Sequence, residues 1–224
     1  MLGLPAAVLF DMDGLLIDTE GVSEATYRQT CLAHDAAVAA DAYGRLIGRD
    51  QPEQRAIFKT LLPDHVDLAR FDREWRQAFL DQLEHHVPLK PGARDLCAWL
   101  SQRSVPMVVA TSTLTDKAET LLQRAGLFPY LVGVVGGDQV ERGKPAPDLY
   151  LAAATMAGAM PADAVAFEDT PQGVMAAKAA GVPVIQIPDM IPADEVSRAA
   201  TMLVADSLNA AARYRSGAGL PRST

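Results

Sequence analysis

Short apolar segments alternate with helical patterns along most of the chain. Ala6 to Phe10 form an uninterrupted apolar run of strand length, and similarly short apolar runs lie at 105–110, 131–135, 164–167 and 182–187. Between these runs, apolar residues recur at spacings of three and four, which predicts helices over 93–103, 115–125, 147–157 and 171–180. Strands that are apolar on both faces and alternate with helices predict a parallel sheet covered on both sides. The expected fold is therefore an α/β, Rossmann-like core.

The segment from Glu20 to Val87 departs from this alternation, because it holds helical patterns and no convincing strand. Its helices are predicted from Thr19 onward and over about 42–47, 51–62 and 71–86. We therefore predict an all-α unit, residues 18–89, inserted into a core of residues 1–17 and 90–212. A last helix (193–200) and an edge strand (202–205) would complete the core, and residues 213–224 have the composition of a flexible tail.

Composition narrows the classes of protein to consider. Apolar residues make up 49% of the chain and charged residues 21%, which is typical of a globular protein. The net charge of −8, with no basic stripe, argues against a nucleic-acid partner. An acidic protein that binds a phosphorylated ligand must supply positive charge locally, from Lys, Arg, backbone N–H groups or a metal ion.

Cysteine usage and the absence of long apolar runs bear on the compartment. Cys31 and Cys97 are the two cysteines and no C-x-x-C spacing occurs, which favours buried free thiols over a disulfide or a zinc site. The N-terminus has no positively charged leader, and no run is long enough to cross a bilayer. We expect a cytoplasmic, monomeric protein without a membrane partner.

Polar residues follow the predicted strands, at the end of the sheet where ligands of such folds bind. Two aspartates and a glycine follow the first strand, hydroxyls follow the second, a lysine follows the third, and two acids follow the fourth. These residues are Asp11, Asp13 and Gly14, then Thr111, Ser112 and Thr113, then Lys144, and then Glu168 and Asp169. One edge of the sheet is therefore expected to collect four carboxylates, several hydroxyls and one ammonium group.

Each of these groups also has a purely structural explanation. Asp-x-Asp-Gly is a common turn, and Thr-Ser-Thr before a helix is an ordinary N-cap cluster. Lys144 alone could be a solvated surface charge, and Glu168-Asp169 before Pro171 would suit the start of a helix. Their joint occurrence at one sheet edge favours a functional site.

The chemistry that these residues support is phosphoryl transfer. A carboxylate can attack phosphorus and form an aspartyl-phosphate, and a second carboxylate two residues on can protonate the leaving oxygen and later activate water. A divalent cation such as Mg²⁺ and a lysine would offset the negative charge. Hydroxyls and backbone donors at a helix N-terminus would hold the phosphate oxygens.

Four motifs in this order resemble the haloacid dehalogenase superfamily: FDMDGLLIDTE (10–20), VVATST (108–113), GKPAPD (143–148) and FEDTPQG (167–173). The helical insertion directly after the first motif is similar to the cap of the β-phosphoglucomutase and phosphoglycolate phosphatase-like branch. The resemblance extends from Val8 to about Ile187, which is nearly the whole chain.

The resemblance implies a role for each motif residue. Asp11 would be the nucleophile, Asp13 the general acid and base, and Lys144 the group that steadies the nucleophile and the phosphate. Mg²⁺ would be held by the Asp11 carboxylate, the Asp13 main-chain carbonyl and Asp169, with Glu168 as a direct or water-mediated partner. Phosphate and substrate would be bound by a further set, which is Gly14, Thr111, Ser112, Lys144 and Arg49.

Two departures from the branch bear on the reaction. Its mutases carry a histidine shortly after the Asp-Thr that follows the first motif, and Thr19 to Ser23 contain none. They also carry an arginine three residues after a cap glycine, and counting from Gly48 leads to Gln51. The sequence therefore predicts a Mg²⁺-dependent phosphatase acting on a small phosphorylated metabolite, such as a sugar phosphate. A phosphohexomutase of the β-phosphoglucomutase type is the alternative, and a non-catalytic module resembling a phospho-receiver is a third reading.

Overall fold

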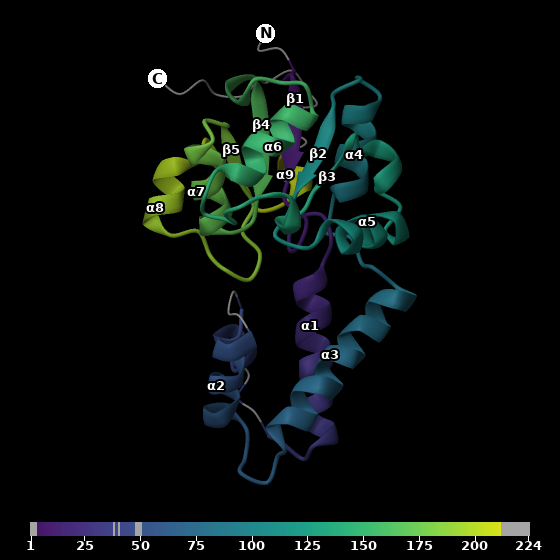
Figure 1. Ribbon diagram of the computed structural model, residues 1–224, viewed down its shortest axis with the longest axis vertical. Coiled ribbons are helices and arrows are strands. Elements are labelled where there is room, and N and C mark those ends of the chain that lie inside the picture. The colour runs from purple at the N-terminus through teal and green to yellow at the C-terminus, as the bar shows by residue number, and fades with distance from the viewer. Residues whose placement is uncertain (1–3, 38, 40, 48–50, 212–224) are drawn as a thin grey trace. The chain divides into compact units, whose positions relative to one another are not determined.

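The computed structural model describes residues 4–37, 39, 41–47 and 51–211 (Figure 1). Arg49 and the predicted tail, 213–224, lie outside these residues. The chain divides into two compact units, one within Met1–Asp18 and Pro88–Thr224 and the other within Thr19–Val87. In the described part of the chain, no helix combines the length and the apolar character needed to cross a membrane.

A parallel sheet of six strands forms the first unit, with the order β3-β2-β1-β4-β5-β6. The strands are β1 (Ala7–Phe10), β2 (Met107–Ala110), β3 (Gly133–Val135), β4 (Ala164–Glu168), β5 (Val184–Gln186) and β6 (Leu203–Val204). All five neighbouring pairs run parallel. The α/β, Rossmann-like fold predicted from the sequence is confirmed, and β1 lies between β2 and β4, the strands that precede two of the polar motifs.

Helices connect the strands and cover the sheet. They are α4 (Ala93–Ser101), α5 (Thr115–Arg124), α6 (Asp148–Met156), α7 (Pro171–Ala179), α8 (Glu195–Ala200) and α9 (Leu208–Ala211), with 3₁₀ turns η2 (Phe128–Tyr130), η3 (Gly137–Gln139) and η4 (Pro161–Asp163). One core cluster joins strand residues such as Leu9 and Val108 to Leu149 of α6 and Val174 of α7, and all four are fully buried. Burial of these apolar side chains between the strands and helices α6 and α7 stabilises the layered arrangement.

Two strands begin later than their apolar runs because of proline. The run 105–110 becomes a strand only from Met107, and the run 182–187 only from Val184. Pro106 and Pro183 have no N–H to give to a neighbouring strand. Each instead accepts a hydrogen bond through its carbonyl, from Val8 N at 2.9 Å and from Ala166 N at 2.8 Å.

The second unit is helical and has its own core. It contains α1 (Thr19–Ala33), η1 (Tyr43–Arg45), α2 (Gln51–Leu61) and α3 (Leu68–His85). Aromatic side chains from α1, α2 and α3 pack around Tyr27, whose ring centroid lies 5.8 Å from that of Phe71 and 5.5 Å from that of Trp75. The carboxylate of Asp72 is buried among them, where Arg55 and Arg76 donate hydrogen bonds to it.

The structure corrects two helix predictions in this unit. The helix expected over 42–47 is wrong, because the structure has only a 3₁₀ turn there, closed by a 2.8 Å hydrogen bond from Leu46 N to Tyr43 O. A segment this short that contains Gly44 cannot repay the free energy of starting an α-helix. Helix α3 begins three residues before the predicted start, since Asp67 caps it by accepting hydrogen bonds from Ala69 N and Arg70 N.

The two stretches of backbone that join the first unit to the second are paired with each other. Asp18 N donates to Pro88 O at 2.9 Å, and Lys90 N donates to Leu16 O at 3.0 Å. Ile17 and Leu89 form an antiparallel bridge between these bonds. The first unit therefore holds residues 16–18 and 88–90 side by side.

Candidate active site

Adjacent strands bring the predicted acids and hydroxyls to one edge of the sheet. Asp11 follows β1 directly, and its N–H continues the ladder by donating to Phe167 O of β4 at 2.9 Å. Thr111 follows β2, and its N–H donates to Val135 O of β3 at 3.0 Å. Both residues are buried, at 6% and 1% exposure. The carboxyl edge of the sheet therefore positions these groups through backbone hydrogen bonds.

Two threonine hydroxyls contact one carboxylate oxygen of Asp13. Thr113 Oγ1 donates to Asp13 Oδ2 at 2.9 Å, and Thr111 Oγ1 lies 3.4 Å from the same oxygen. Thr113 N in turn donates to Thr111 Oγ1 at 3.1 Å. Asp13 is thus held by the segment after β2, whereas Ser112, predicted to act beside Thr111, is exposed.

Lys144 joins two of the buried carboxylates. Its ammonium group donates to Asp11 Oδ1 and to Glu168 Oε1, and its side chain is 8% exposed. The same ammonium lies 5.4 Å from the centroid of the Tyr150 ring, which belongs to α6. Lys144, which follows the third strand, therefore contacts the carboxylate after the first strand and the carboxylate that ends the fourth.

Glu168 ends β4 and is fully buried. Besides Lys144, three groups donate to its carboxylate: Tyr150 OH to Oε1 at 3.0 Å, and Thr170 N and Thr170 Oγ1 to Oε2 at 3.0 and 3.1 Å. Thr170 Oγ1 also accepts from Gly173 N at 3.1 Å and so caps α7. A Cβ on Gly173 would overlap the Glu168 carboxylate, so only glycine fits at that position.

Asp11, Glu168 and Asp169 form an acidic cluster that could hold a metal ion. Each offers one carboxylate oxygen, and these oxygens lie within 4.8 Å of one another. Gly14 has a left-handed φ of 83°, and a Cβ there would come within 2.5 Å of Asp169 Oδ2. Gln186 of β5 donates to Asp169 O at 3.2 Å. Carboxylate oxygens are the donors that Mg²⁺ and similar hard cations prefer.

The charges in this cluster do not balance. Burial raises the pKa of Asp11 to about 8, although Lys144 opposes the shift, and burial also raises the pKa of Asp169. Burial alone would raise the pKa of Glu168, but Lys144 and the hydrogen bonds from Thr170 and Tyr150 lower it. Burial disfavours the charged form of Lys144, yet Asp11 and Glu168 outweigh that effect and raise the pKa of its ammonium. When all three buried carboxylates are ionised, the one ammonium group does not neutralise them, and a divalent cation could supply the missing positive charge.

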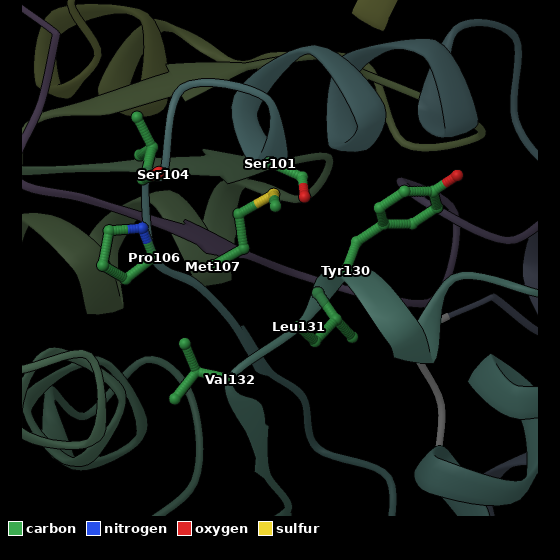
Figure 2. A pocket seen from close by; sticks show the side chains of 8 residues that line it. Ser101, Ser104, Pro106, Met107, Tyr130, Leu131 and Val132 are labelled. Carbon is green, nitrogen blue, oxygen red and sulfur yellow. The ribbon is translucent and has the colours of Figure 1, made fainter.

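A separate open cavity of about 280 Å³ lies at the other end of two strands. Figure 2 shows Met107, Tyr130 and Val132 among the side chains around it. Met107 begins β2 and Val132 precedes β3, so this cavity opens at the amino ends of the strands. The acidic cluster lies at the carboxyl ends, which is where ligands of doubly wound sheets bind.

Comparison with known proteins identifies the family. A family model described as haloacid dehalogenase-like hydrolase matches residues 5–181. The chain belongs to this hydrolase family. The match covers every strand-end motif described above and also the inserted helical unit.

Individual relatives of this hydrolase are phosphatases by name. The phosphorylated carbohydrates phosphatase of Thermotoga maritima is 33% identical over 180 residues, covering 79% of this chain and 82% of the relative. The (DL)-glycerol-3-phosphatase 2 of Arabidopsis thaliana is 36% identical over 190 residues, covering 81% and 79%. Among solved structures, a candidate β-phosphoglucomutase of Thermotoga maritima superposes with a TM-score of 0.80 at 27% identity, covering 94% of this chain and 98% of that one.

The site of this hydrolase contains three groups that were not assigned an individual role from the sequence. Thr113, Tyr150 and Thr170 all donate to motif carboxylates. Thr113 and Thr170 stand inside the motifs, so their hydroxyls were visible as candidates. Tyr150 occupies a buried position of an apolar helix, where periodicity indicates core packing. Arg49, predicted to contact substrate, lies outside the described residues.

Proposed function

We propose that this hydrolase is a Mg²⁺-dependent phosphatase that cleaves the phosphoric monoester of a small phosphorylated metabolite through an aspartyl-phosphate on Asp11. The observation that carries the proposal is the unequal placement of two aspartates. Asp11 is buried against Lys144 within the acidic cluster, whereas Asp13 is half-buried and held by threonine hydroxyls. Two carboxylates in different surroundings can divide nucleophilic and proton-transfer work.

The nucleophilic step is assigned to Asp11. A carboxylate oxygen of Asp11 attacks phosphorus, the bond from phosphorus to the ester oxygen breaks, and the phosphoryl group is left on the carboxylate. Lys144, which donates to Asp11, neutralises part of the charge on this carboxylate and on the incoming phosphate. Mg²⁺, when bound, would supply further charge neutralisation, held by Asp11 and Asp169 with the main-chain carbonyl of Asp13 and with Glu168 beside them.

Proton transfer is assigned to Asp13. Its carboxyl group gives a proton to the departing ester oxygen, and the carboxylate then takes a proton from the water that attacks the aspartyl-phosphate. Hydrogen bonds from Thr113 and Thr111 to Oδ2 fix the orientation of the carboxyl group for this proton transfer. Inorganic phosphate and the free alcohol are the products, and both aspartates return to their starting states.

The names of the relatives support the substrate class. They describe enzymes for phosphorylated carbohydrates and for glycerol 3-phosphate, which are small phosphoric monoesters. We therefore propose a sugar phosphate or a similar polyol phosphate as substrate. A mutase must also bind a second phosphate group, and the stretch from Thr19 to Ser23 has no histidine to assist in that task.

A phosphate-release screen tests this function. The purified protein with Mg²⁺ should release inorganic phosphate from at least one member of a panel of sugar, polyol and acid phosphates. Asp11→Asn should abolish release, whereas the control Asp95→Asn, an exposed position on α4, should leave it unchanged. A mutase would instead convert β-glucose 1-phosphate, primed with glucose 1,6-bisphosphate, to glucose 6-phosphate. Phosphate release that survives in Asp11→Asn would rule out Asp11 as the nucleophile.

A further inference from the structure

The carboxylate of Glu168 has its hydrogen-bonding capacity filled within the protein. A carboxylate offers about four lone-pair sites, two on each oxygen. Lys144 Nζ and Tyr150 OH donate to Oε1, and Thr170 N and Thr170 Oγ1 donate to Oε2. Four donors therefore occupy four acceptor sites on a side chain that is fully buried.

Tyr150 contacts both members of the Lys144–Glu168 pair. Its hydroxyl donates to Glu168 Oε1 at 3.0 Å, the oxygen that also accepts from Lys144. The Lys144 ammonium lies over its ring, 5.4 Å from the ring centroid, which is within the range of a cation–π attraction. Burial, followed by the negative charge of Glu168, raises the pKa of Tyr150 well above its ordinary value, so the hydroxyl remains a donor at working pH.

The surroundings leave the carboxylate little freedom. Glu168 packs against Gly173 at the start of α7, where no Cβ could be accommodated. Thr170, which donates twice to Oε2, is itself fixed as the cap of α7. Of the four donors, the Tyr150 hydroxyl is the one that can be removed while its ring, its backbone and the α7 cap are kept.

We propose that the Tyr150 hydroxyl is a positioning group which, by occupying the remaining acceptor site of Glu168 Oε1, commits Glu168 to holding Lys144 instead of coordinating the metal ion. Glu168 then holds the Lys144 ammonium in place, and this ammonium donates a hydrogen bond to Asp11. Metal coordination is left to the Asp11 and Asp169 carboxylates and the main-chain carbonyl of Asp13. This inference deepens the proposed function and rests on it.

The first test uses Tyr150→Phe, with Tyr130→Phe as the matched control far from the site, at the amino end of β3. Brief acetylation of the substrate-free protein, mapped by peptide mass spectrometry, reports how well Lys144 is held. We expect acetylation of Lys144 in Tyr150→Phe to rise by about three-fold or more, because one of the groups that hold its partner is lost. The exposed Lys117 is the internal standard and should not change. Equal Lys144 labelling in Tyr150→Phe and the wild type would overturn the proposal.

The second test compares metal affinity in the absence of substrate. We expect Asp169→Asn to weaken Mn²⁺ binding, measured by electron paramagnetic resonance, by about ten-fold more than Glu168→Gln does, because of these two residues Asp169 would be a direct ligand and Glu168 would not. Equal losses in the two variants would show that Glu168 is a ligand and would overturn the assignment. Neither test needs substrate, so a failed phosphate-release screen leaves both of them readable.

The third measurement separates positioning from stability. With the substrate found in the screen, we expect Tyr150→Phe to lower kcat by about five-fold with KM nearly unchanged, because Lys144 acts on the reacting groups. The thermal midpoint should stay close to that of Tyr130→Phe, since the ring still fills the core. A lower midpoint with unchanged kcat would show that Tyr150 serves only to stabilise the fold and would refute the positioning role.

Discussion

Thr113 Oγ1 donates a hydrogen bond to Asp13 Oδ2 at 2.9 Å. The two residues lie on loops after β2 and β1, so this bond orients Asp13 from a different strand. Replacing Thr113 by valine keeps the shape of the side chain and removes the donor.

We expect Thr113→Val to lower kcat by about ten-fold, since a proton-transfer group that has lost its orientation retains only part of its effect. Steady-state kinetics with the substrate from the screen measures the change. Thr120→Val on the exposed side of α5 removes a hydroxyl away from the site and should keep wild-type kinetics. Wild-type kcat in Thr113→Val would show that Asp13 needs no support from this hydroxyl.

The close packing of α7 on Glu168 gives a second prediction. In Gly173→Ala the new methyl group would overlap the Glu168 carboxylate, so the carboxylate or the start of α7 must shift. We expect a loss of about 1–3 kcal/mol in the free energy of unfolding, together with reduced activity. Chemical denaturation measures the first effect and phosphate release the second.

Gly44→Ala is the matched control for this substitution. A Cβ at Gly44 meets no atom within 4 Å, and its backbone has no left-handed φ. The free energy of unfolding should change by less than about 0.5 kcal/mol. If Gly173→Ala were as mild as Gly44→Ala, the tight packing around Glu168 would be disproved.

The raised pKa values of Asp11 and Asp169 predict how stability depends on pH. Burial raises the pKa of Asp11 from 3.8 to about 8, so between these values the folded protein holds a proton that the unfolded chain has lost. Asp169 shifts in the same direction. Because the folded state binds more protons than the unfolded state, the metal-free protein loses stability as the pH rises through this window.

Thermal unfolding in EDTA from about pH 6 to about pH 8 should therefore show a falling midpoint. Glu168, whose pKa is lowered, stays ionised throughout this range and does not offset the fall. Saturating Mg²⁺ should raise the midpoint most at the upper end, since binding requires the ionised carboxylates. The fall should be smaller in Asp11→Asn. A midpoint that rises with pH in EDTA would contradict the crowding of charge in this cluster.

The buried carboxylate of Asp72 gives a prediction for the helical unit. Arg55 and Arg76 donate to it, and it is 2% exposed, whereas both arginines reach solvent. We expect Asp72→Asn to reduce the free energy of unfolding by about 1.5–3 kcal/mol, because charge-assisted hydrogen bonds are lost in a buried position. Glu24→Gln, which breaks a solvent-exposed pair with Arg28, should cost less than about 1 kcal/mol. Equal losses in the two variants would mean that the burial of Asp72 does not increase the contribution of its ion pairs to the free energy of unfolding.

Much of the fold followed from local patterns, and the exceptions have physical reasons. The apolar runs before Asp11, Thr111 and Glu168 became neighbouring parallel strands, as their pattern predicted. Pro106 and Pro183 shortened two strands, because a missing N–H decides where a ladder starts, and apolar character alone does not reveal this. The segment around Gly44 had helical spacing but was too short to form a helix.

The site was predictable in its residue types and less so in its partners. Motif positions such as Lys144 and Glu168 were identified from strand ends. Their contact with Tyr150 could not be foreseen, since a buried aromatic residue on an apolar helix looks the same whether or not its hydroxyl meets a carboxylate. Which threonine holds Asp13 likewise depends on the turn after β2, and that geometry is set only in the folded chain.

The pairing of residues 16–18 with 88–90 gives the first unit a single place where an inserted segment begins and ends. Because Asp18 N and Pro88 O are hydrogen-bonded and Ile17 pairs with Leu89, the chain leaves and re-enters the sheet unit through adjacent positions. Lengthening a flexible insert between these positions adds little loop-closure entropy, since each doubling of its length costs only about 0.6 kcal/mol. We therefore expect that a different segment could replace the 69 residues Thr19–Val87 while the carboxyl edge of the sheet keeps its own framework.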